Sequence, residues 1–181
     1  MKKSKGFTLV ELLAVIVILA VLVLVATPAV TSIMQKSQKN AFKNEMLSIV
    51  DIMNNVYTEK VAKGVSASFV ASKKVSNVTN GGKYKYLCMT LQDLVTEQYL
   101  KKDLTGYSGY VAMWVPDGTG ETKYLINVSN TSYFMQGSYK ALAGSEYLPS
   151  QTGTEETNYK SFASCPSTAM APIADNVVLN K

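Results

Sequence analysis

The chain has 181 residues, of which 47% are apolar and 17% are charged, and its formal net charge is +5. It contains no histidine, the usual general base and commonest metal ligand, and no arginine, the usual bidentate reader of phosphate. Three lysines lie in the first five residues, so the rest carries 15 lysines against 13 acidic residues, and this near-neutral balance disfavours strong nucleic-acid binding.

A basic leader with three lysines precedes Gly6 and Phe7, and an almost unbroken apolar run follows. Residues 12–30 are 19 in number, and as a helix they would be about 28 Å long, close to the thickness of a bilayer's hydrocarbon core. No small-residue cleavage site closes the run. We therefore expect any cut to precede the apolar segment, which stays as an anchor with the leader on the cytoplasmic side.

Glu11 is the unexpected residue, because it is a carboxylate at the start of this apolar run. Ionisable groups in membrane segments are costly and functional by default. One alternative is a plain anchor whose Glu11 is an interfacial accident. The other, which we favour, is that the charge has a partner.

Residues 7–11 read Phe-Thr-Leu-Val-Glu, and after the basic leader and Gly6 they resemble the class III signal of type IV prepilins and related pseudopilins. The resemblance implies that a membrane peptidase cuts after Gly6 and that the new N-terminus, Phe7, is methylated. Glu11 and Pro28 then occupy the family's carboxylate and proline positions. Glu11 would pair with the charged N-terminus of Phe7 on a neighbouring subunit and set the axial register.

A helical period continues beyond the apolar run. Apolar residues recur there at steps of three and four: Phe42, Met46, Ile49, Met53 and Val56. One helix from Phe7 to about Ala62 would be about 84 Å long, with a first half that is apolar all round and an amphipathic second half that packs on a domain. Lys63 and Gly64 provide a stop signal.

Pro28 lies inside this expected helix, where it lacks a backbone donor and crowds the preceding turn. A modest kink is one outcome, since transmembrane helices tolerate proline. The family resemblance implies the other outcome, a locally extended segment in the filament.

The remaining residues, 64–181, are expected to form one globular head. Strands are predicted at residues 75–79, 83–87, 107–115, 122–129, 132–139 and 170–179, and residues 68–71 are a short strand or a helical turn. A helix is expected after Thr90, which can cap it with Asp93. Its apolar face would consist of Leu91, Leu94, Val95, Tyr99 and Leu104. Residues 142–164 are predicted to be a polar surface loop.

These elements predict an α+β fold in which an antiparallel sheet packs on the amphipathic half of a long N-terminal helix. The expected divisions are a leader at residues 1–6, a transmembrane half at 7–30, an amphipathic half at 31–63 and a head at 64–181. The resemblance implies the ladle shape of a pilin.

The two cysteines, Cys88 and Cys165, can pair in a domain outside the cytoplasmic membrane, or they can be two separate buried thiols. Many pilins carry a C-terminal disulfide, and this favours pairing. Here the enclosed loop would span nearly half of the chain rather than only its end.

Signals for other chemistry are sparse. Asp117 and Glu121 are candidates for a calcium site in a glycine-rich turn, but such a site needs six to eight oxygens, and a plain hairpin is the favoured interpretation. No cofactor is expected, and no catalytic set was found, so we expect no enzymatic activity. Lysines interleaved with Tyr84 and Tyr86 resemble a nucleic-acid contact patch, which the chain's charge disfavours.

The predicted function is that of a structural subunit of a type IV pilus, polymerising through its N-terminal helix into a filament for adhesion, motility or DNA uptake. Its expected partners are copies of itself, prepilin peptidase, the pilus assembly machinery and the membrane. It would be a single-pass protein of the cytoplasmic membrane before assembly and a surface filament afterwards. A pseudopilin of a type II secretion or competence system is the first alternative, and a membrane-anchored binding or enzymatic domain is the second.

Overall fold

A computed structural model describes residues 6–62, 76–78, 83–101, 104, 106–151, 164–166 and 172–178. The chain divides into two units, residues 1–38 and residues 39–181. The boundary predicted after Val30 is a different one, between the apolar and the amphipathic half of the helix, and it stays a prediction. The side chains of residues 31–38 are exposed, and buried positions begin at Phe42, in the second unit.

The long helix is less uniform than the sequence predicted. Helix α1 (Leu9–Leu47) begins two residues after Phe7, and α2 (Ile49–Val56) follows a single irregular residue, Ser48. The Ser48 hydroxyl donates to the carbonyl oxygen of Glu45 at 2.7 Å, which is the kind of local bond that competes with helix geometry. A π-helical segment, η1 (Tyr57–Ala62), ends the described helical stretch. The expected stop at residues 63 and 64 lies outside the described residues.

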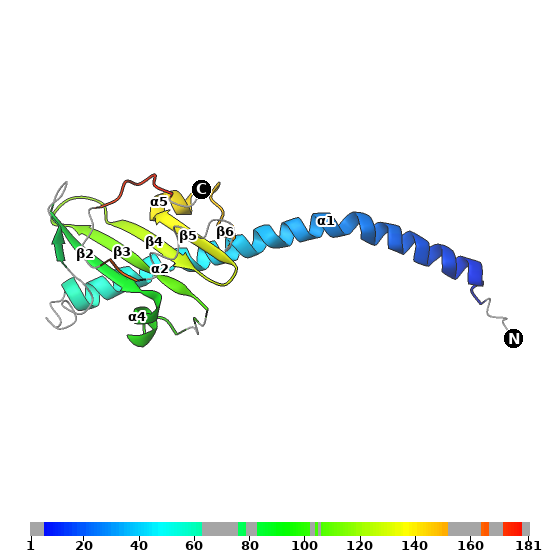
Figure 1. Cartoon of the computed structure of the whole chain (residues 1–181), viewed down its shortest axis with the longest axis horizontal. Coiled ribbons are helices and arrows are strands. Elements are labelled where there is room, and N and C mark those ends of the chain that lie inside the picture. Colours follow the sequence, from blue (N-terminus) through cyan, green and yellow to red (C-terminus); the bar gives the residue numbers. More distant parts are fainter. Residues whose placement is uncertain are drawn as a thin grey trace. The chain divides into compact units, whose positions relative to one another are not determined.

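The second unit contains an antiparallel sheet in which every strand pairs with its neighbour in sequence. Its strands within the described residues are β1 (Ser76–Val78), β2 (Tyr84–Thr90), β3 (Ser108–Pro116), β4 (Lys123–Ser129), β5 (Tyr133–Ser138) and β6 (Ser150–Gln151). Helix α2 crosses one face of this sheet (Figure 1). The predicted meander and α+β class are confirmed, while residues 68–71 lie outside the described part.

The main hydrophobic core lies between the sheet and the helical residues at the end of α1 and in α2. The five helix residues predicted from their spacing are all buried there: Phe42, Met46, Ile49, Met53 and Val56. Alternate residues of the central strands face them: Leu87, Met89, Val111, Met113, Ile126 and Val128. The 3.6-residue period of the helix and the two-residue period of the strands therefore meet in one apolar layer.

Two tyrosine hydroxyls connect the helical segment to other parts of the head, one on β4 and one after α4 (Leu91–Thr96). Tyr124 donates to the Asn54 side chain at 2.6 Å. Tyr99 donates to the carboxylate of Glu59 at 2.8 Å. Hydrogen bonds are directional, so these contacts restrict how the helical segment can slide or rotate against the head, which apolar packing alone does not.

Lys43 is buried, with 7% of its surface exposed, although it is charged. Its ammonium group donates to the carbonyl oxygens of Gly144 at 2.6 Å and Tyr147 at 3.1 Å, and it lies 5.8 Å from the centre of the Tyr147 ring. Burial lowers the pKa of this ammonium. The carbonyl groups and the ring replace its lost hydration, so Lys43 ties α1 to the segment that follows α5 (Tyr139–Ala143).

The opposite face of the sheet is also buried. A second cluster of side chains, here called the outer-face cluster, consists of Tyr86, Cys88, Tyr110, Ala112, Trp114 and Leu125. Cys165 and Ile173, from the C-terminal part of the chain, pack against it. The central strands are therefore covered on both sides, which makes their burial continuous rather than alternating.

Two sequence expectations for the C-terminal third are wrong for the residues that the structure describes, and the rest of both segments lies outside them. Residues 142–164 do not form only a surface loop, because Leu142 is fully buried in α5 and residues 150–151 form β6. Of the strand expected at 170–179, the described residues 172–178 contain one bridge, between Val178 and Gly137. The hydroxyl of Ser138 caps the short helix α5 by accepting from the Ala141 amide at 3.3 Å.

The predicted cap at Thr90 is confirmed, although α4 (Leu91–Thr96) is shorter than expected. The Thr90 hydroxyl accepts from the Asp93 amide at 3.1 Å, and the Asp93 carboxylate accepts from the Thr90 amide at 3.0 Å. Leu91 and Leu94 are fully buried on its apolar face.

Replacing this cap should have a measurable cost. Thr90→Ala removes the hydroxyl acceptor and is expected to lower the free energy of unfolding of the head by about 1 kcal/mol. Thr96→Ala, at the exposed end of the same helix, is the matched control and should change it by less than about 0.5 kcal/mol. Urea unfolding followed by fluorescence of the single tryptophan, Trp114, measures both; equal effects would contradict a capping role.

Candidate functional site

The carboxylate of Glu11 takes part in a capping box at the start of α1. Its Oε2 atom accepts from the Thr8 amide and from the Thr8 hydroxyl, both at 2.8 Å. The Thr8 hydroxyl in turn accepts from the Glu11 amide at 3.3 Å. Sequence reasoning treated Glu11 as an isolated charge and missed the signal, which is the threonine three residues before it at a helix start.

The box explains how the chain tolerates a carboxylate at this position. Glu11 lies in the first turn of α1, where the helix dipole favours negative charge. Both Thr8 donors reach the same atom, Oε2, and Oε1 has no hydrogen-bond partner among the described residues. One oxygen thus serves the chain's own helix, and the other is open to a second donor.

Gly6 and Phe7 precede the helix and are exposed. A side-chain carbon added at Gly6 would have nothing within 4 Å, and 86% of the Phe7 surface is accessible. Both residues that flank this peptide bond are therefore exposed in the single chain.

The apolar residues after the box have no cover within the chain. Every described side chain from residue 7 to residue 38 is exposed, including large ones such as Leu9 and Leu24. Among the described residues, one helix is long and apolar enough to cross a membrane, and it lies near the N-terminus. An apolar surface of this extent needs lipid or other protein around it.

Helix α1 continues through Pro28 in this structure. Hydroxyl groups around the proline donate to main-chain carbonyls: Thr27 donates to Val23 at 2.6 Å, and Thr31 donates to Pro28 at 2.9 Å. In an apolar environment such bonds satisfy carbonyl groups that water cannot reach. The single chain is therefore helical here.

Cys88 and Cys165 form a disulfide, with their Cα atoms 5.9 Å apart. Cys88 is on β2 within the outer-face cluster and is almost fully buried. The bond connects the centre of the sheet to the C-terminal part of the chain across 77 residues.

The calcium candidates are not joined by further ligands among the described residues, where no group of three or more acidic, cysteine or histidine side chains could hold a metal. Glu121 instead forms an ion pair with Lys140. Asp117 begins the turn after β3, and its amide donates to the Lys83 carbonyl oxygen at 2.8 Å.

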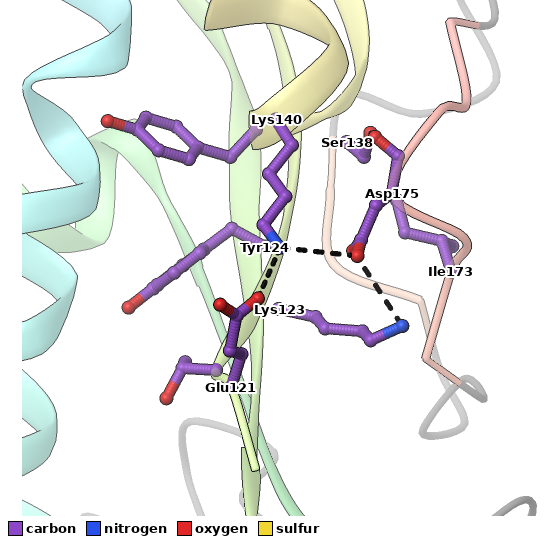
Figure 2. Close-up of a pocket in the computed structure, with 9 residues that line it drawn as sticks. Glu121, Lys123, Tyr124, Ser138, Lys140, Ile173 and Asp175 are labelled. Carbon is purple, nitrogen blue, oxygen red and sulfur yellow. Dashed lines mark hydrogen bonds and ion pairs between the residues drawn. The ribbon is translucent and has the colours of Figure 1, made fainter.

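A pocket of about 320 Å³ lies beside this ion pair, between β4, the β5–α5 junction and residues 173–175 (Figure 2). Its walls include Lys123, Lys140 and Asp175. The Asp175 carboxylate lies 3.7 Å from the ammonium of Lys123 and 3.4 Å from that of Lys140. The charges at this site are paired with one another.

The chain is α+β, with an exposed N-terminal helix that is long and apolar enough to cross a membrane and with an antiparallel sheet. This combination of elements is consistent with a pilin fold. Residues 1–27 match the family model of the prokaryotic N-terminal methylation motif. The N-terminal segment is therefore a class III prepilin leader of the kind that type IV pilins and pseudopilins carry, which confirms the resemblance. No curated protein and no solved structure shows a significant match to the chain.

Proposed function

We propose that the chain is a structural subunit of a type IV pilus, which polymerises through its N-terminal helix into a cell-surface filament. The observation that carries the proposal is the capped carboxylate of Glu11 at the head of an apolar helix with no cover. Lipid covers this helix before assembly, and the helices of sister subunits cover it afterwards. Contacts that repeat head to tail without closing a ring give a filament.

Maturation prepares the contact. Prepilin peptidase cuts between Gly6 and Phe7 and the amino group of Phe7 is methylated, in keeping with the methylation motif at residues 1–27. The leader's lysines remain in the cytoplasm, and the mature chain is a single-pass protein of the cytoplasmic membrane until the assembly machinery extracts it.

The assembly contact pairs the Phe7 ammonium of one subunit with Glu11 of its neighbour. Oε2 is engaged by Thr8 in the same chain, so the incoming ammonium binds Oε1. Both charges are then neutralised in a low-dielectric filament core, and the pair sets the axial register.

Two substitutions separate the charge from the cap. Glu11→Gln keeps a residue that can complete the capping box but removes the charge. Loss of one partner of a buried pair costs about 3–5 kcal/mol, so filaments are expected to fall to background. Thr8→Val removes the hydroxyl and leaves the carboxylate, so this control is expected to assemble. Sheared fibres are measured by electron microscopy and immunoblotting.

Mass spectrometry of the membrane fraction shows whether both variants are processed to Phe7, so that a cleavage defect is not mistaken for an assembly defect. Normal filaments from Glu11→Gln would refute the charge pair. If Thr8→Val loses filaments and Glu11→Gln does not, assembly depends on the helix cap and not on the charge pair.

A pseudopilin is the second candidate, because the methylation motif is common to both groups. A body subunit of a short pseudopilus would need the same Glu11 contact. Long sheared fibres whose main band is this chain favour the pilus. Their absence from cells that contain the mature chain favours the pseudopilin.

A further inference from the structure

The C-terminal strap, defined as residues 164–166 and 172–178, is attached to the head by more than its disulfide. One of its side chains, Ile173, packs on the outer-face cluster that contains Trp114. The strap therefore helps to cover the second apolar face of the sheet.

A set of non-covalent contacts, here called the clasp, holds the far end of the strap to β5. The Ser138 hydroxyl donates to the carbonyl oxygen of Asp175 at 2.7 Å, and the Ser138 amide donates to that of Val177 at 2.8 Å. Gly137 forms an antiparallel bridge with Val178. Ser138 is only 3% exposed, so water competes little for these bonds.

Gly137 makes this close approach possible. A side-chain carbon at Gly137 would lie 2.5 Å from the Val177 carbonyl oxygen and 3.1 Å from the Val178 Cα atom. Both are main-chain atoms, so the strap would have to move away. The position thus gives a way to open the clasp without touching the disulfide.

The charges near the clasp contribute less. Asp175 faces Lys123 and Lys140 in Figure 2, but these side chains are roughly a third to a half exposed. Exposed ion pairs are screened and contribute little, whereas the Ser138 contacts are buried and directional. The clasp therefore depends mainly on Gly137 and Ser138.

We propose that the clasp docks the strap before Cys88 and Cys165 are oxidised, and that this docking directs the two cysteines to pair within one chain. With the clasp closed, Cys165 is tethered to the head by the short stretch before Asp175, which replaces a search through a 77-residue loop by a search within that stretch. In oxidation the two thiols lose two protons and two electrons, and a disulfide reagent such as oxidised glutathione is reduced to two thiols. The bond then locks a strap that is already in place.

Trp114 reports on docking, because it is the only tryptophan and is fully buried in the outer-face cluster. The full chain in detergent micelles is compared as wild type, as Cys88→Ala with Cys165→Ala, and as that cysteine-free chain with Gly137→Ala. Acrylamide quenching of Trp114 should stay near the wild-type value without the disulfide and should rise severalfold once the clasp is also opened.

Gly144→Ala in the cysteine-free chain is the matched control, because its added carbon would meet only the Ala141 carbonyl oxygen, at 3.1 Å. If Gly137→Ala fails to fold, a cysteine-free chain that ends before Pro172 removes the clasp without inserting an atom into the sheet, and its Trp114 should also be quenched. Strong quenching on loss of the disulfide alone would overturn the proposal, as would an unquenched Trp114 in the shortened chain.

Reoxidation tests the pairing step. The reduced wild-type chain and its Gly137→Ala variant, in detergent micelles at low protein concentration, are treated with oxidised glutathione. The products are separated on a non-reducing gel. The wild type should form the intrachain bond, and the variant should form it severalfold more slowly, with more disulfide-linked dimer. Equal rates and equal dimer fractions would refute a directing role for the clasp.

Discussion

A chain that begins at Lys39 is expected to be a soluble monomer that never enters filaments. It retains the second unit with its whole core, including Phe42 and Met46, and it lacks the exposed apolar residues 7–38. Because those residues form the only surface that our assembly proposal uses, their loss should abolish both membrane association and polymerisation. Sedimentation of cell fractions measures membrane association, light scattering measures the monomeric state, and electron microscopy measures filament formation.

A second truncation tests where the head begins. A chain that starts at Ile49 also loses Phe42, Lys43 and Met46, which are buried. It should fail to fold or should aggregate, since its core is incomplete and the carbonyl groups that bind Lys43 lose their partner.

The first truncation also tests the assembly proposal. Fibres of normal dimensions from the chain that begins at Lys39 would contradict the role of the N-terminal helix in assembly.

Reduction of the disulfide is expected to lower the stability of the head strongly. Closing a loop across 77 residues restricts the unfolded chain, and the chain-entropy model gives about 4.5 kcal/mol as an upper value. The midpoint of urea unfolding of the chain that begins at Lys39 should therefore fall strongly when a reductant is added.

The control for this prediction is the same chain with Cys88→Ala and Cys165→Ala, whose midpoint should not respond to the reductant. If the oxidised and reduced forms unfold at the same urea concentration, the disulfide does not constrain the unfolded state as expected. A large loss of stability with a docked strap is consistent, because the entropic effect acts on the unfolded chain and the clasp acts on the folded one.

Sequence patterns predicted the elements whose cause is local. Apolar steps of three and four between Phe42 and Val56 identified the buried face of the helix, since a helix places such residues on one side. Thr90 and Asp93 identified the start of α4, since a capping box needs only four consecutive residues. The same rule applied to Thr8 and Glu11 would have found the cap at the start of α1.

Features that depend on distant residues were missed. Leu142 lies in a polar stretch, and it is buried only because α5 packs on strands that are formed earlier in the chain. Lys43 is a charged residue between apolar positions of an amphipathic helix, and nothing nearby in the sequence indicates its partners, which are about a hundred residues away. Glu121 was considered as a cation ligand, and its partner is Lys140.

The sequence by itself determined the leader, the apolar span with its early carboxylate, and the periodicity of the main core, because each follows from the order and spacing of neighbouring residues. Only the tertiary structure decided that the sheet is covered on both faces and that a clasp at Gly137 holds the C-terminal strap. These features depend on which atoms approach one another in space, and a one-dimensional pattern does not specify the side chains that compete for each partner.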